Sequence, residues 1–450
     1  MTANKLEETY IPYRRTDLIN LCLEEGKLEG KQIKVFKEFC EILSAFYHFR
    51  FHKTLEVIKD NYIFFNPHSD VHHVLEPNLE QYEEMKVKVI NSVKSVLERA
   101  SYHPIPDSII QNALGKKSLI NLKTEVDFND FEGVFCCYRG NTQKNIKVKK
   151  YWFWKTVKSI DIFERVVLLI HFKGKGYFQA KASRSKKYQD LNFLPGKIYI
   201  YFYKNIPKLD IDLLFPNLKT SMTWKDRLLF GVPALGAAIP LILKILPNLL
   251  VILAAILLIL NASSLVQSME VEPEKAENLM SVLVATLSLV LALGGFATQQ
   301  YNKYKSKQLK FQKDVTDTLF FKNLANHDSA VQVLVDLAEE EECKEIILVY
   351  YHLITSSHPL TPEQLDQDIE AWLKQKTNLK INFDIHGPLN NLHEIRGKLI
   401  NKKGAITKES LIPILSYDSQ GCCHVLPLEK AKMIIDYVWD HAFQYNGGIL

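Results

Sequence analysis

The chain has 450 residues, of which 47% are hydrophobic and 24% are charged, and its formal net charge is +5. This composition excludes a protein made mainly of membrane spans, and it allows two or three domains with a sizeable core. The net charge is too small to indicate a nucleic-acid-binding protein by itself. The number of cysteines, seven, is odd, and no C-x-x-C pair occurs. Both facts argue for a reducing compartment and against a disulfide framework.

The first part of the chain predicts a helical region followed by a small sheet. Residues 1–125 place apolar side chains at helical spacing, most clearly in KQIKVFKEFCEILSAFYHFRFHKTLEVIKDNY. Residues 126–219 contain short β-branched and aromatic runs, which include GVFCCYRG, ERVVLLIHFKGK and GKIYIYFYKNIP. We therefore expect an N-terminal helical region and, after it, the β-rich part of the same α+β domain.

Two apolar runs within residues 220–300 predict a membrane segment. Residues 245–265 and residues 279–297 are each long enough for one transmembrane helix. Lysines flank the pair and glutamates occupy the loop between them, so the positive-inside rule predicts a hairpin with both termini on the inner side. Residues 228–243, interrupted by two prolines, are expected to be interfacial or re-entrant. A third crossing in that stretch is the alternative.

The chain after the membrane segment predicts two further regions. Residues 301–356 indicate a helical region that carries a cluster of carboxylates. Residues 357–450 show helix, helix and hairpin patterns in that order, which is typical of a winged-helix-like domain. This last region has 10 Lys and Arg against 11 Asp and Glu, a net charge of −1. We therefore expect it to contact protein and not nucleic acid.

The carboxylate cluster is the strongest candidate site. Glu342 and Glu345 project from an apolar helix face, and Glu341 and His352 lie at its edge. Buried carboxylates need partners, so one hypothesis is a divalent-metal site made of these four residues. The alternatives are ion pairs to lysine or arginine from a neighbouring helix, or a helix whose middle is hydrated. The metal is not favoured, because the Glu-x-x-His pairs of di-iron bundles are missing here.

A second set of polar residues is expected to join the two halves of the chain. We expect Arg139, Lys204, Asp210 and Asp212 to make polar contacts between the two domains. The glutamates of the carboxylate cluster, Glu341, Glu342 and Glu345, are expected to take part in the same contacts. The two aspartates also form a D-x-D pattern, which some glycosyltransferases use to hold a metal-bound nucleotide. That pattern is short and common, so contact between the two halves is the preferred interpretation.

Several stretches resemble one uncharacterised family of membrane proteins, the family that includes transmembrane protein 143. The resemblance runs in order along nearly the whole chain, through IPYRRTDLI, YHFRFHKTLEVIKDNYIFFNP, DFNDFEGVFCCYRG, ERVVLLIHF, YKNIPKLDIDLLFPN, FFKNLANHDSAVQVLVDLAEEEECKE and LDQDIEAWL. It implies a domain of unknown function with a central membrane hairpin, found in organelles of eukaryotes, without an established activity. It supplies no catalytic residue and no cofactor-binding residue.

The sequence therefore predicts an α+β, mostly helical fold that a two-helix transmembrane hairpin anchors in a membrane. The hairpin would separate an N-terminal helical and small-sheet domain from a C-terminal helical, winged-helix-like domain. We expect a multi-pass protein of a bacterial inner, thylakoid-type or organelle membrane. Its expected function is that of a non-enzymatic scaffold with membrane lipid and a protein partner or second copy as partners. The alternatives are a metal-dependent membrane-bound enzyme and an oligomeric channel or transporter.

Overall fold

The protein is described here by a computed structural model that covers residues 9–71, 77–110, 123–151, 154–184, 191–221, 279–399 and 410–442. The chain divides into two compact units. The main unit is formed by Met1–Ala113, Asp127–Asn217 and Lys322–Leu450, and the second unit by Leu114–Val126 and Leu218–Phe321. The main unit thus contains segments from both ends of the chain.

Three helices from the N-terminal part belong to the main unit: α1 (Arg15–Glu24), α2 (Lys31–Tyr62) and α3 (Leu79–Arg99). The helical spacing expected for α2 is confirmed, and its buried face carries large side chains such as Phe36, Phe39 and Leu43. Asn78 starts α3 with a capping box, in which it exchanges side-chain and backbone hydrogen bonds with Gln81.

The main unit also contains a five-stranded antiparallel sheet in the order β1-β3-β4-β5-β7. Its strands are β1 (His103–Pro104), β3 (Phe131–Tyr151), β4 (Trp154–Phe172), β5 (Ile198–Pro207) and β7 (Asn323–Asn326). Strands β3, β4 and β5 lie after residue 126, in the region where the sequence predicts short strands.

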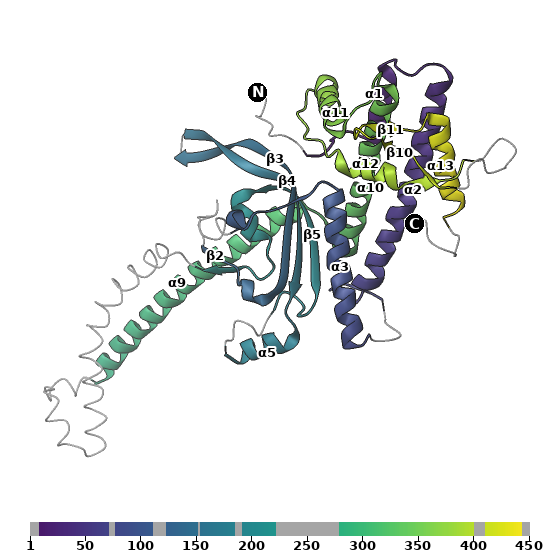
Figure 1. Cartoon of the computed structure of the whole chain (residues 1–450). Coiled ribbons are helices and arrows are strands. Elements are labelled where there is room, and N and C mark those ends of the chain that lie inside the picture. Colours follow the sequence, from purple (N-terminus) through teal and green to yellow (C-terminus); the bar gives the residue numbers. More distant parts are fainter. Residues whose placement is uncertain are drawn as a thin grey trace. The chain divides into compact units, whose positions relative to one another are not determined.

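Strand β4 lies at the centre of this sheet (Figure 1), and its last seven residues, 166–172, are buried on both faces. Its run VVLLI is apolar at every position, as a strand covered on both sides requires. Val167 and Leu169 pack into the same core as helices α2 and α3. On the other side Phe172 stacks on Phe193, and a short helix, α5 (Lys175–Arg184), contributes Phe178 to the same aromatic group.

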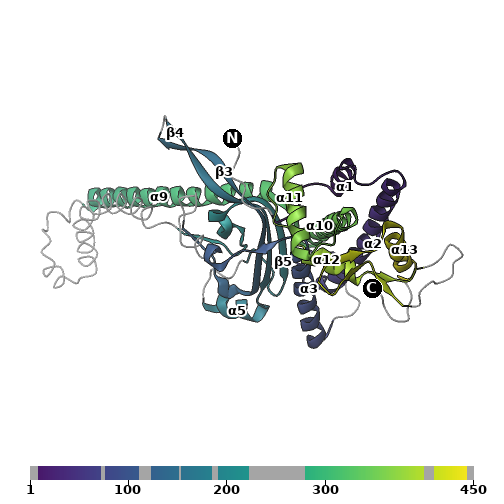
Figure 2. The same cartoon turned by 45° about the horizontal axis from the view of Figure 1, so that its top comes forward.

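Helix α10 (His327–Thr355) connects the two halves of the chain within the main unit. It follows directly on β7, whose pairing with β5 places a C-terminal strand at the edge of the N-terminal sheet. It packs against α1, α2 and α3, and also against α11 (Pro362–Thr377) and α12 (His386–Glu394) (Figure 2). The hydrophobic core is therefore continuous between both halves.

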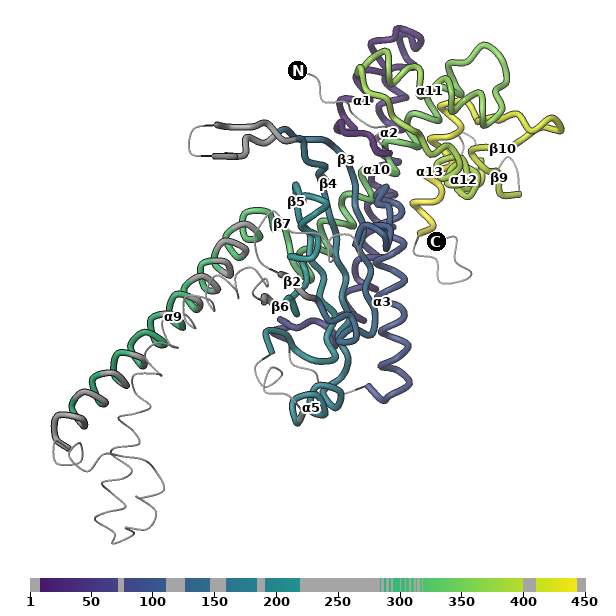
Figure 3. The backbone as a smooth tube through the Cα atoms, turned by 90° about the vertical axis from the view of Figure 1, so that its left-hand side faces the viewer, coloured from purple at the N-terminus to yellow at the C-terminus, as the bar shows by residue number. Residues whose placement is uncertain are grey.

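The C-terminal part of the main unit carries short strands between its helices. They are β8 (Arg396–Gly397), β9 (Ile412–Pro413), β10 (Leu415–Tyr417) and β11 (Cys423–Val425), and helix α13 (Leu428–Asp440) follows and packs against α2 (Figure 3). The expected order of helix, helix and hairpin is present in α11, α12 and the β10–β11 pair. The winged-helix-like classification and the domain boundaries stay predictions.

The second unit contains the strand pair β2 (Lys123–Glu125) and β6 (Lys219–Ser221) and a helix, α9 (Leu279–Lys322), whose last residue belongs to the main unit. The expected hairpin is corrected here. Residues 228–243 and the first expected span, 245–265, lie outside the described residues.

The second expected span, residues 279–297, is only the first part of the 44-residue helix α9, which continues without a break through the lysine-rich sequence that follows. No helix within the described ranges has the length and the apolar character that a membrane crossing needs. The predicted anchoring by a transmembrane hairpin, and with it the multi-pass membrane localisation, is therefore wrong.

Candidate functional site

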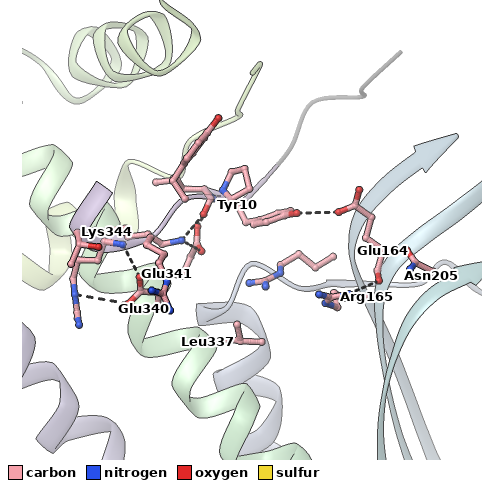
Figure 4. Close-up of a pocket in the computed structure, with 15 residues that line it drawn as sticks. Tyr10, Glu164, Arg165, Asn205, Leu337, Glu340, Glu341 and Lys344 are labelled. Carbon is pink, nitrogen blue, oxygen red and sulfur yellow. Dashed lines mark hydrogen bonds and ion pairs between the residues drawn. The ribbon is translucent and has the colours of Figure 1, made fainter. Parts of the chain in front are cut away.

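A polar cavity of about 680 Å³ lies in the main unit, where the N-terminal segment, residues 10–16, passes between α10 and the sheet (Figure 4). Figure 4 shows Glu340, Glu341 and Lys344 on one side and Glu164, Arg165 and Asn205 on the other. The lining consists of the whole N-terminal segment, four residues of β3, β4 and β5 (Arg139, Glu164, Arg165 and Asn205), and four residues of α10 (Leu337, Glu340, Glu341 and Lys344).

A buried ion pair on α10 fixes the N-terminal segment. The Ile11 backbone N–H donates to Glu341 Oε1 at 2.6 Å, and Lys344 Nζ donates to the Ile11 carbonyl at 2.5 Å. Lys344 also donates to Glu341 Oε2 at 2.8 Å, and both side chains are at most 4% exposed. The pair thus satisfies both backbone groups of Ile11 in the way a neighbouring strand would.

The glutamate just before Glu341, Glu340, contacts the start of helix α1. Its Oε1 accepts the Arg15 backbone N–H at 2.8 Å, and its Oε2 lies 3.9 Å from Arg15 Nε. The first N–H groups of a helix have no partner within the helix, so a carboxylate at this position satisfies one of them and complements the helix dipole. The N-terminal end of α1 therefore lies at the wall of the cavity, where Arg14, Arg15 and Thr16 line it.

The sheet side of the cavity carries cations in register on adjacent strands. Arg139 on β3 lies directly opposite Arg165 on β4, and Arg165 lies directly opposite Lys204 on β5. Directly opposite residues share one face of a sheet, and like charges placed there repel each other. None of the salt bridges recorded among the described residues gives Arg139 or Arg165 a carboxylate partner.

Arg139 is the most buried cation of this row, with 8% of its surface exposed. Its guanidinium group lies 4.5 Å from the ring centroid of Tyr10 and 5.0 Å from that of Tyr102, and one terminal nitrogen donates to the Ala100 carbonyl at 3.1 Å. Its Nε is buried and has no hydrogen-bond partner in the described structure. Two rings and one carbonyl thus hold this side chain in place and leave a donor unused.

Two residues with positive φ shape the same part of the sheet. Gly140 has φ +74° and Asn205 has φ +52°. A Cβ atom on Gly140 would lie 2.7 Å from Glu164 Oε2. The same oxygen accepts a hydrogen bond from the hydroxyl group of Tyr10, with an O–O distance of 3.1 Å. Glycine at this position is therefore required both for the backbone conformation and for the approach of the Glu164 side chain.

Replacing Gly140 with alanine should lower the free energy of unfolding by at least about 1–2 kcal/mol, because the left-handed conformation is unfavourable for a residue with a Cβ. Displacement of Glu164 adds to that loss. A denaturant titration measures it. Gly133→Ala on the same strand is the matched control, since a Cβ there meets no atom within 4 Å. Equal losses in the two variants would contradict this account of Gly140.

The four residues of the proposed metal set do not share one set of contacts. Glu341 is bound by Lys344 and Ile11, whereas Glu342 accepts two hydrogen bonds from Arg99 of α3, at 2.5 and 2.8 Å. Nδ1 of His352 lies 2.9 Å from the Leu348 carbonyl. No group of three or more metal-ligating side chains is arranged to hold an ion within the ranges that the structure describes. The metal set stays a prediction.

Glu345, another member of that set, is not among the residues that line the cavity. Burial, with Glu341, Asp384 and Glu342 nearby, raises the pKa of Glu345 well above its ordinary range. Burial likewise lowers the pKa of His352 below its ordinary range. Both shifts favour the neutral form of the side chain.

The four residues expected to make interdomain contacts lie in two places. Arg139 lines the cavity, and Lys204 lies beside it in the same cross-strand row. Asp210 and Asp212 belong to a short 3₁₀ helix, Lys208–Leu214, away from the cavity lining. Burial lowers the pKa of Lys322, and the nearby carboxylate of Asp210 opposes that shift. The interdomain role of all four stays a prediction.

Most polar residues of this cavity are not predicted as site residues from the sequence: Tyr10, Arg14, Arg15, Glu164, Arg165 and Asn205. A weak signal was present, because the stretches IPYRRT, CYRG, FERV and YKN each place an arginine or lysine beside an apolar run. Only the strand register and the position of the N-terminal segment bring these stretches together.

Comparisons with known proteins give one match. A family described as a protein of unknown function (DUF3754) matches residues 163–329, which contain Glu164, Arg165 and Asn205 but neither Arg139 nor Glu341. Searches of curated proteins and of solved structures find no match. The chain therefore carries a domain of unknown function, as the sequence indicated, and the more specific resemblance to the family of transmembrane protein 143 stays a prediction.

Proposed function

We propose that this chain is a non-enzymatic interaction protein, and that the cavity below the N-terminal segment is its binding site for an anion. The observation that carries the proposal is the pair of arginines, Arg139 and Arg165, which lie directly opposite each other in the strand register and both line the cavity. Neither is paired with a carboxylate among the recorded salt bridges of the described residues. An anion in the cavity would relieve their mutual repulsion and use the free donor of Arg139.

The lining favours binding over catalysis. None of the described lining residues is a histidine, cysteine or serine, the side chains that most often act as nucleophile or general base. The three lining carboxylates already accept hydrogen bonds: Glu164 from Tyr10, Glu340 from the Arg15 backbone and Glu341 from Ile11 and Lys344. Each of them thus helps to hold the N-terminal segment in place.

Thermal unfolding of the full chain with a panel of anionic, cationic and neutral small molecules tests this function. We expect anions to stabilise the protein, since a ligand at 100 times its Kd adds about 2.7 kcal/mol. Arg165→Gln should remove the effect, whereas Arg396→Gln, which changes an exposed arginine outside the lining, should retain it. Mass spectrometry should find the ligands chemically unchanged. Stabilisation by cations or neutral molecules alone, or turnover that depends on Arg165, would overturn the proposal.

A further inference from the structure

We infer that the anion is a phosphate monoester carried on a small organic molecule, and that Arg139 and Arg165 hold its phosphate group. This inference rests on the proposed function and specifies its ligand. Three features of the cavity lead to it: the surplus charge of the lining, the cross-strand register of the two arginines, and the position of a helix N-terminus.

The charge of the lining matches a dianion better than a monoanion. Five cationic side chains line the cavity (Arg14, Arg15, Arg139, Arg165 and Lys344) against three carboxylates (Glu164, Glu340 and Glu341), which leaves two positive charges in excess. A phosphate monoester carries a charge of about −1.5 to −2 at pH 7. A carboxylate or a sulfate ester carries about −1, so it would leave part of this excess uncompensated in a partly enclosed space.

The two arginines are placed to share one tetrahedral group. Residues directly opposite each other on antiparallel strands have Cβ atoms about 4.5–5.5 Å apart on the same face of the sheet. The guanidinium group of Arg139 is already oriented by Tyr10, Tyr102 and the Ala100 carbonyl, so little side-chain entropy is lost when its buried Nε donates to a ligand. Planar guanidinium groups pair with phosphate or carboxylate oxygens through parallel hydrogen bonds, and the excess charge of the lining favours phosphate of the two.

Helix α1 adds a further electrostatic contribution. It has 10 residues, and its first turn begins beside the cavity, where Thr16 contributes to the lining. Glu340 already accepts the Arg15 N–H of this turn, so what α1 adds is mainly its dipole, whose N-terminal end attracts anions such as phosphate. Asp17, the acidic residue of this turn, is exposed and does not line the cavity.

The size of the cavity indicates that phosphate is only part of the ligand. A volume of about 680 Å³ lies within the usual range for small-molecule sites, about 300–1,000 Å³, and far exceeds the volume of one phosphate group. The rings of Tyr10 and Tyr13 belong to the wall that the N-terminal segment forms. They offer flat faces against which the organic part of the ligand can pack.

Isothermal titration of the full chain with phenyl phosphate, phenyl sulfate and benzoate tests the inference at pH 7.5. The two esters have nearly the same shape, so their comparison isolates the second negative charge. We expect phenyl phosphate to bind at least ten-fold more tightly than either monoanion. Its affinity should fall as the pH drops below about 6, because the phosphate then loses its second charge.

Variants assign this binding to the two arginines. Arg165→Gln and Arg139→Gln should each weaken phenyl phosphate at least ten-fold, and Arg139→Lys should weaken it less than Arg139→Gln. Arg165 is only partly buried, so its variant stays informative if the Arg139 variants fail to fold. Arg396→Gln should bind as the wild type does.

Equal affinities for phenyl phosphate and phenyl sulfate, both sensitive to Arg165→Gln, would overturn the phosphate assignment and leave the proposed anion-binding function in place. An absence of binding by all three compounds would overturn both. Binding of phenyl phosphate that neither arginine variant weakens would place the phosphate elsewhere and overturn the inference.

Discussion

Replacing Lys344 with alanine should lower the free energy of unfolding by about 3–5 kcal/mol. The variant leaves the carboxylate of Glu341, which is 2% exposed, buried without its cation. It also removes the hydrogen bond from Lys344 Nζ to the Ile11 carbonyl, which loosens the segment that covers the cavity. A denaturant titration measures the loss, and proteolysis within the first 20 residues should become faster.

An exposed ion pair provides the matched control for this variant. Lys88 lies 2.8 Å from Glu84 on the surface of α3, with side chains 54% and 63% exposed, so Lys88→Ala should change stability by less than about 1 kcal/mol. The double variant Glu341→Gln/Lys344→Met keeps an acceptor for the Ile11 N–H and leaves no unpaired charge. It should therefore be more stable than Lys344→Ala. A loss below 1 kcal/mol in Lys344→Ala would show that this pair does not hold the segment.

The helices and strands of the main unit could be predicted because their patterns are local. The apolar spacing in α2, the continuous run of β4 and the Thr361 cap of α11 each lie within one short stretch of sequence. The hairpin prediction also rested on local patterns, the apolar character of residues 245–265 and 279–297. It is wrong because no helix within the described ranges has the length and the apolar character that a membrane crossing needs.

The cavity could be predicted only in part, because its partners are distant in the sequence. The pattern of α10 predicted that Glu342 lies on the apolar face and Glu341 at its edge, but it could not identify their partners. Ile11 lies 330 residues from Glu341, and Arg99 lies 243 residues from Glu342. Arg139 was selected from the sequence and Arg165 was not, although the sheet register makes them direct neighbours.

The same distance in sequence has a consequence for folding: the two halves of the chain should unfold together. Phe39 of α2 is fully buried and stacks on Tyr350 of α10, with ring centroids 4.2 Å apart. The hydroxyl group of Tyr350 donates to the Leu426 carbonyl at 2.8 Å, just before α13. A single aromatic contact therefore links an N-terminal helix to the C-terminal end of the core.

Replacing Phe39 with alanine should lower the free energy of unfolding by about 3–5 kcal/mol, because it removes a large buried ring and leaves a cavity. Hydrogen exchange should become faster in α10 and α13 as well as in α2, since all three helices belong to one core. Val57→Ala is the control on the same helix, where the side chain is 48% exposed and the expected change is within about 0.5 kcal/mol. If exchange in α10 and α13 kept its wild-type rate in Phe39→Ala, the two halves would be separate folding units, and the cavity between the N-terminal segment and α10 could open without unfolding either half.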